Sequence, residues 1–216
     1  MELSIIFLPL IASIVSGFFG RYIGDRNSEI VTSALVSISA LLSIYVLYQV
    51  IVNQYEENIV IATWISSGSL VVNWSMLIDP LSAVMLVVVT SVSALVHVYS
   101  IGYMSHDPHK PRFMAYLSLF TFAMLMLVTS DNFIQLFFGW ECVGLCSYFL
   151  IGFWCKKESA NAAAIKAFVV NRVGDFGFAL GIFLIFYLLE QWVNLRRYYF
   201  IHGCLMLWKV QHLFLH

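Results

Sequence analysis

The chain has 216 residues, of which 61% are hydrophobic and 11% are charged, and its formal net charge is −1. Its mean hydropathy is +0.88, and a soluble domain usually carries about 25% charged residues, so the composition predicts a membrane protein. No basic stripe suggests nucleic acid as a partner, and four cysteines without a CxxC pair predict neither a disulfide framework nor a metal site.

Six segments are long and apolar enough to cross a lipid bilayer. The first follows Glu2 rather than a basic stretch, so we interpret it as a retained span and not as a cleaved signal peptide. Asp79 and Asn132 precede the third and fifth spans and are predicted to cap those helices. We therefore expect an all-α membrane protein, a bundle of about six transmembrane helices. The predicted spans are 3–20, 30–52, 80–104, 113–129, 133–154 and about 162–189.

The connection between the second and third spans, residues 54–79, is long enough to have its own structure. Its segments 59–64 and 70–77 are rich in Val, Ile and Trp and flank the turn sequence Ser-Ser-Gly-Ser. This pattern predicts a β-hairpin. We expect the hairpin to lie on one membrane surface, with partial insertion as the alternative.

Basic residues alternate between the connections. They occur in the first, third and fifth loops, and the second and fourth carry none. By the positive-inside rule, the odd loops face the cytoplasm, or the matrix of an organelle, and the N-terminus lies outside. The basic residues that carry this prediction are Arg21, Arg26, Lys110, Arg112, Lys156 and Lys157.

The last segment, 190–216, does not follow this alternation. It should emerge outside, yet it carries Arg196, Arg197 and Lys209. It is either a short amphipathic interfacial helix or a tail that is not native to the fold, for example one translated from a shifted frame, and we favour the second interpretation. We therefore divide the chain into a transmembrane region, 1–189, and an atypical tail, 190–216.

Glu141 is the one charged residue in the apolar run from 133 to 154. In a helix it lies about 12 Å from one end of the run, close to the middle of the hydrocarbon. An ionisable group costs about 2.5 kcal/mol or more there unless it faces protein, water or a partner charge. A carboxylate in this position favours a proton or ion path.

The sixth span carries Lys166, Arg172 and Asp175, at about 6, 15 and 20 Å from its cytoplasmic end. The fifth span runs the other way, so Glu141 and Asp175 are expected at a similar depth. Arg172 and Asp175 are spaced i,i+3 and can pair, either as a structural ion pair or as part of a charged row that relays protons. Lys166 is either a titrating partner in that row or a side chain that extends to the surface.

His97 in the third span could belong to a polar chain, although we favour a hydrogen-bonded structural histidine. Cys142 and Cys146 share one face of the fifth span at i,i+4, and no second pair completes a site, so we interpret them as small packing residues.

Residues 99–154, followed by KAFVVNRVGDFGF, resemble the largest antiporter-like membrane subunit of proton-pumping NADH:quinone oxidoreductase. The similarity covers about residues 3–188, and the multisubunit cation/proton antiporters share much of the pattern. The resemblance places the family's essential glutamate at Glu141. It places the family's Asn-Arg-Val-Gly-Asp at 171–175, which contains Arg172 and Asp175, and the family's lysine at Lys166.

The resemblance implies a membrane subunit that contributes a proton-translocation half-channel coupled to electron transport. No cofactor is expected in this chain, and NADH, flavin, iron–sulfur clusters and quinone are expected in other subunits. The implied partners are the other membrane-arm subunits of the respiratory complex and the lipid bilayer. The implied location is the bacterial plasma membrane or the mitochondrial inner membrane.

The main departure from the family is length, since the resemblance implies some 14 to 16 helices and this chain has about six. We therefore expect a truncated copy of the subunit. Two alternatives are a subunit of a multisubunit cation/proton antiporter and a nonfunctional remnant that inserts into the membrane.

Overall fold

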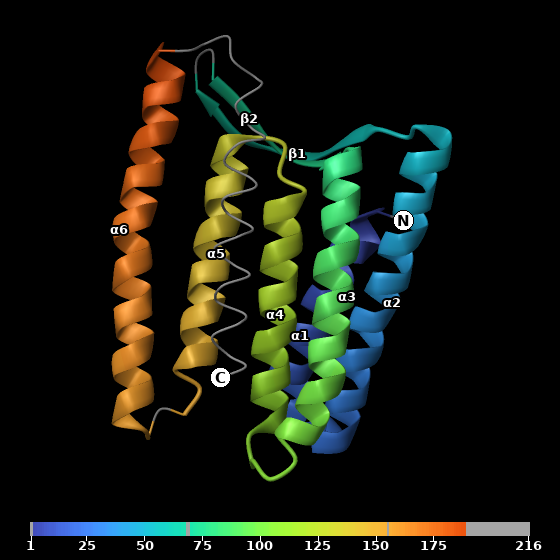
Figure 1. Ribbon diagram of the computed structural model, residues 1–216, viewed down its shortest axis with the longest axis vertical. Coiled ribbons are helices and arrows are strands. Elements are labelled where there is room, and N and C mark those ends of the chain that lie inside the picture. The colour runs from blue at the N-terminus through green and yellow to red at the C-terminus, as the bar shows by residue number, and fades with distance from the viewer. Residues whose placement is uncertain (1, 68–69, 155, 189–216) are drawn as a thin grey trace. The chain divides into compact units, whose positions relative to one another are not determined.

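The computed structural model describes residues 2–67, 70–154 and 156–188. Within these ranges, six helices are long and apolar enough to cross a membrane, and two strands form one antiparallel hairpin. The predicted all-α architecture with a hairpin is therefore confirmed (Figure 1). The elements are α1 Glu2–Ile23, α2 Asp25–Asn53, β1 Glu57–Ser67, β2 Leu70–Ile78, α3 Pro80–Tyr103, α4 Lys110–Val128, α5 Phe133–Ile151 and α6 Glu158–Leu188.

The chain divides into two compact units within α6, after Phe168. Helices α1–α5, the hairpin and the start of α6 belong to the first unit, and residues 169–188 are the described part of the second. The predicted tail, 190–216, lies outside the described residues.

Helix α4 is the centre of the first unit, where it packs against α1, α2, α3 and α5. Its apolar side chains are distributed around the whole helix, which is typical of a helix with no solvent-facing side. Small side chains, among them Ala115, Ser118 and Ala123, are buried on it and allow its neighbours to approach closely. On the α5 side, the position of Gly139 has no room for a side chain, because an added Cβ would lie 2.9 Å from Leu127 Cα.

The predicted caps are confirmed. Asp79 accepts a hydrogen bond from the Ser82 amide at 2.7 Å, and Ser82 Oγ accepts one from the Asp79 amide at 2.8 Å, so α3 begins with a capping box. Asn132 Oδ1 accepts a hydrogen bond from the Gln135 amide at the start of α5. Between α1 and α2 the chain turns at Gly24, whose φ of 86° favours glycine.

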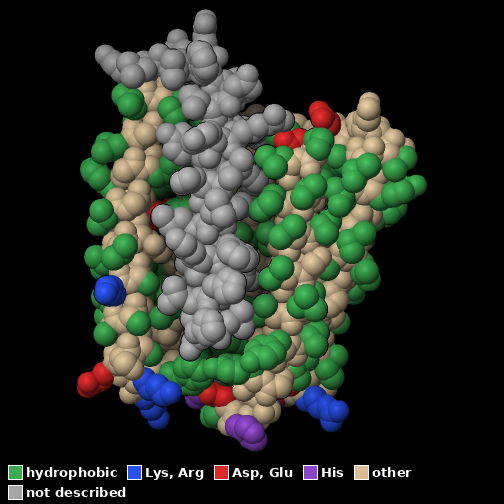
Figure 2. Space-filling model, viewed as in Figure 1, with side chains coloured by type: hydrophobic (Ala, Val, Ile, Leu, Met, Phe, Trp, Pro, Cys, Tyr) green, Lys and Arg blue, Asp and Glu red, His purple; other side chains and the backbone are tan. Residues whose placement is uncertain are grey.

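The hairpin is longer than predicted and contains two register shifts, between Val60 and Ala62 and between Thr63 and Ile65. It covers one end of the bundle, opposite the α1–α2, α3–α4 and α5–α6 connections (Figure 1). At that opposite end lie the basic residues of the odd loops, and Figure 2 shows Lys and Arg side chains gathered there. We call it the basic end.

Several predicted span boundaries shift by three to five residues: α1 ends at Ile23 rather than 20, α4 begins at Lys110 rather than 113, and α6 begins at Glu158 rather than about 162. Helix α2 begins at Asp25, five residues before the predicted start at 30, so it includes Glu29. Helix α5 ends at Ile151, with Gly152 as its C-cap, rather than at 154.

Candidate functional site

Helix α5 has two clearly different faces. Its buried residues recur every three or four positions, as expected for the face that packs on α4. They include Leu136, Gly139, Val143 and Leu150. The opposite face carries Phe138 and Leu145, which are 37% and 42% exposed.

Glu141 lies on that opposite face, because it follows Phe138 by three residues and precedes Leu145 by four. Its side chain is half-buried. It is about 12 Å along α5 from Phe133 and about 15 Å from Ile151, so it sits near the middle of the span. The depth predicted for Glu141 therefore agrees with the helix boundaries.

Helix α6 brings two of the predicted residues together. Arg172 Nη1 lies 3.6 Å from Asp175 Oδ2, in an i,i+3 ion pair. The Asp175 side chain is buried, whereas 39% of the Arg172 side chain is exposed. The pair predicted from the spacing is thus present.

Lys166 is exposed. It precedes Asp175 by nine residues, or two and a half helical turns, so the two residues project from opposite sides of α6. Lys166 therefore does not extend the Arg172–Asp175 pair. The similar depth of Glu141 and Asp175 stays a prediction, since the two residues belong to separate units.

His97 is fully buried between α3 and α4. Its Nδ1 lies 2.7 Å from the Ser93 carbonyl oxygen, which only accepts, so Nδ1 donates there. Nε2 lies 3.0 Å from Ser118 Oγ on α4 and can accept its hydroxyl hydrogen. Ser93 Oγ in turn contacts Thr121 Oγ1. Both ring nitrogens are engaged, which fits the structural histidine that the sequence favours.

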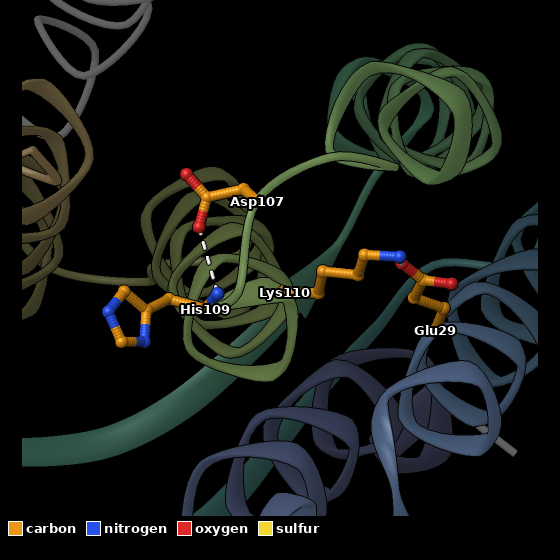
Figure 3. Close-up of polar contacts among 4 residues, drawn as sticks. All are labelled: Glu29, Asp107, His109 and Lys110. Carbon is orange, nitrogen blue, oxygen red and sulfur yellow. Dashed lines mark hydrogen bonds and ion pairs between the residues drawn. The ribbon is translucent and has the colours of Figure 1, made fainter.

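Glu29 is a buried carboxylate that sequence reasoning missed. It is 5% exposed, and its Oε1 lies 3.8 Å from Lys110 Nζ at the start of α4. Figure 3 shows the Lys110 side chain reaching across to Glu29. A signal was present, because Glu29 begins the 3–4 spacing of small residues, Thr32, Val36, Ser39 and Ser43, that forms the buried face of α2.

The loops at the basic end contact one another. Trp154 Nε1 donates to Asp107 Oδ2 at 3.0 Å, and Arg112 donates to the Phe153 carbonyl at 2.9 Å. The His109 amide donates to Asp107 Oδ1 at 2.8 Å (Figure 3). Burial acts to raise the pKa of Asp107, but the two hydrogen bonds and the positive charges of His109 and Arg112 outweigh it, so this pKa lies below its usual value.

Within the described ranges, no three His, Cys, Asp or Glu side chains come together as a metal site. The chemistry that these residues can support is therefore that of carboxylates, cations and hydroxyl groups: proton uptake, proton release and hydrogen bonding.

Two family models match the chain. The one described as "NADH-Ubiquinone oxidoreductase (complex I), chain 5 N-terminus" matches residues 64–114. The one described as "NADH:quinone oxidoreductase/Mrp antiporter, TM" matches residues 130–215. The second match includes Glu141, Lys166, Arg172 and Asp175, and it extends across most of the segment that the sequence sets apart as a tail.

Curated relatives agree with these matches. The chain is 57% identical over 190 residues to NADH-ubiquinone oxidoreductase chain 5 of Triticum aestivum, covering 88% of this chain and 28% of the relative. It is 53% identical over 198 residues to NADH-quinone oxidoreductase subunit L of Rhodobacter capsulatus, again covering 88% of this chain and 28% of the relative. The chain therefore spans little more than a quarter of the length of these relatives.

Solved structures share the fold. One is a chain of a membrane-bound sulfane sulfur reductase, an archaeal respiratory membrane complex, with a TM-score of 0.70 and 19% identity over 86% of this chain and 37% of that chain. Another is a chain of the Mrp complex of Dietzia, with a TM-score of 0.69 and 23% identity over 83% of this chain and 18% of that chain. At these identities the likeness shows the fold alone.

Proposed function

Because the chain belongs to the family of antiporter-like membrane subunits called chain 5 or subunit L of NADH:quinone oxidoreductase, we propose that it serves in the membrane arm of that enzyme and contributes to its proton path. Like its relatives, it is a multi-pass membrane protein. The proposed location is the plasma membrane of a bacterium or the inner membrane of a mitochondrion, the two settings from which its relatives come.

The position of Glu141 carries the proposal. Glu141 is a half-buried carboxylate near the middle of a span. It lies on the face of α5 that is turned away from α4, so it can contact the groups that line that face. Ionisable groups at this depth generally face a bundle interior or a water-filled cavity, where they mark ion and proton pathways. We assign Glu141 the role of a group that takes up and releases a proton.

The Arg172–Asp175 pair supports a charged path along α6. Arginine stays protonated under all ordinary conditions, so Arg172 places a fixed positive charge 3.6 Å from the Asp175 carboxylate. In general, a fixed positive charge favours the ionised form of a nearby carboxylate, so it affects which groups along a proton path bind protons. Lys166 is an exposed cation within the span, so we propose it as a member of the proton path that acts separately from this pair.

Electron transfer is proposed to take place in other subunits. We expect those subunits to hold NADH, flavin, iron–sulfur clusters and quinone, and we expect the remaining membrane-arm subunits to be this chain's partners. The family model that matches residues 130–215 names the Mrp antiporter as well as the oxidoreductase, but the relatives above 50% identity are named as subunits of the oxidoreductase, which favours the oxidoreductase over the antiporter alternative.

The test is Glu141→Gln, made at the aligned position of a full-length relative and assayed in its assembled complex. Glutamine keeps the size and hydrogen-bonding shape of the side chain but cannot carry a proton. We expect proton pumping to fall by about tenfold or more, the effect of at least 1.4 kcal/mol on a rate-limiting step, while the complex still assembles.

Glu57→Gln is the matched control, since Glu57 is an exposed carboxylate on the hairpin. We expect normal pumping from this variant. Normal pumping by an assembled Glu141→Gln complex would remove Glu141 from the proton path.

A further inference from the structure

Two buried polar side-chain atoms lack a hydrogen-bond partner among the residues that the structure describes: Glu29 Oε1 and Ser33 Oγ. Both lie on α2 near the basic end. Glu29 is 5% exposed and Ser33 is 7% exposed. A buried hydroxyl or carboxylate oxygen without a partner costs about 1–3 kcal/mol, so a native structure seldom keeps one dry.

The two atoms come from one place on the helix. Glu29 and Ser33 are spaced i,i+4, which puts their Cβ atoms about 6 Å apart on the same face of α2. The two oxygens are not hydrogen-bonded to each other, and side chains at this spacing are near enough for one molecule to bridge them.

Lys110 is a third polar group beside Glu29. Its Nζ lies 3.8 Å from Glu29 Oε1, beyond the 2.7–3.2 Å of a direct hydrogen bond. The ammonium group is therefore close enough to share a bridging molecule with the carboxylate. It is 21% exposed, so it also lies near the aqueous surface of the basic end.

The chemistry of the three groups selects the occupant. Lys110 repels a metal cation, and one carboxylate with one hydroxyl supplies too few ligands for one. Glu29 repels an anion. A neutral molecule that both donates and accepts satisfies all three groups, and a buried water typically makes about three hydrogen bonds.

We propose that Glu29 Oε1, Ser33 Oγ and Lys110 Nζ bind an internal water molecule, which hydrates the Glu29–Lys110 ion pair at the basic end of α2. This hydration site is separate from Glu141 and does not depend on the proposed function.

The first test is the effect of Ser33→Ala on the unfolding equilibrium of the full chain in detergent micelles. If the site is hydrated, the variant loses a hydrogen bond to water, and the unfolding constant rises by about fivefold. If the site is dry, the variant relieves an unsatisfied hydroxyl, and the unfolding constant falls. A fall would overturn the proposal.

Ser39→Ala is the matched control on the same helix. Ser39 is also buried, but its hydroxyl donates directly to the Ile5 carbonyl oxygen at 2.7 Å. We expect the unfolding constant to rise in this variant whether or not the site near Ser33 is hydrated, so the assay is shown to detect the loss of one buried hydrogen bond.

The second test is a double-mutant cycle between Glu29→Leu and Ser33→Ala. Leucine cannot hydrogen-bond a water, and Glu29 and Ser33 share no direct hydrogen bond, so a bridging water predicts that the effect of Ser33→Ala shrinks at least twofold in the Glu29→Leu background. If the two substitutions change the unfolding constant by factors that simply multiply in the double variant, a shared water is contradicted, even where each single variant is destabilised.

Discussion

Gln135 on α5 makes both of its side-chain amide hydrogen bonds to the backbone of one hairpin residue, Ser75. Its Oε1 accepts from the Ser75 amide at 3.1 Å, and its Nε2 donates to the Ser75 carbonyl at 2.7 Å. The side chain is 2% exposed. The side-chain amide therefore pairs with the backbone of β2 as a neighbouring strand would, and it attaches the hairpin to the bundle.

Replacing this amide should release the hairpin. Gln135→Leu keeps the side-chain volume but leaves the amide and carbonyl of Ser75 unpaired in a buried place. We expect a loss of about 3 kcal/mol in the free energy of unfolding, measured by denaturant titration in detergent micelles. Asn58→Ala, at an exposed position of β1, should change it by less than about 0.5 kcal/mol. Equal effects of the two variants would show that the Gln135 contact does not hold the hairpin.

The glycines of α5 should differ sharply in their tolerance of a methyl group. Gly139→Ala places a Cβ 2.9 Å from Leu127 Cα, so α4 and α5 must separate, at a cost of about 1–3 kcal/mol. Gly144→Ala meets no described atom within 4 Å and should leave the free energy of unfolding unchanged or slightly higher. Thermal unfolding of the two variants in parallel measures the difference, and a Gly144→Ala variant as unstable as Gly139→Ala would contradict the packing described for α4.

The contact between Asp107 and Trp154 should resist acid. The pKa of Asp107 lies below the ordinary 3.8. A lowered pKa means that the contact is fully present above the ordinary value and is lost as the pH falls through the lowered one. The indole N–H resonance of Trp154 should therefore stay constant from pH 7 to pH 5 and shift only below about pH 3.8. Asp107→Asn should make that resonance independent of pH, and a shift near pH 5 would contradict the lowered pKa.

The orientation in the membrane follows from the position of the basic end. Lys156 and Glu57 are both exposed and lie at opposite ends of the bundle. In a background without the native cysteines, Lys156→Cys should react with an impermeant thiol reagent only from the cytoplasmic or matrix side. Glu57→Cys should react only from the other side. The reverse pattern would invert the topology.

Much of the fold could be predicted because each span carries its own local signal. Length and apolarity located the six helices, and Asp79 and Asn132 marked two helix starts through side chains that bond within three residues. The docking of the hairpin could not be predicted in this way. Gln135 and Ser75 are 60 residues apart, and nothing in either neighbourhood identifies its partner.

The candidate site was predictable to a similar extent. The i,i+3 spacing of Arg172 and Asp175 was sufficient for their ion pair. Glu29 was overlooked because a charge beside an apolar run suggests the end of a span. The spacing of small residues along α2 indicated its buried face, but its ion-pair partner, Lys110, belongs to another helix, and a single sequence does not identify such a partner.

The most direct test of the central claim is an experimental structure of the assembled complex at a resolution that shows ordered water around α5. A proton-carrying Glu141 predicts water or a charged side chain within hydrogen-bonding distance of its carboxylate, on the face of α5 that is turned away from α4. A Glu141 carboxylate surrounded only by lipid acyl chains would contradict a role in proton translocation.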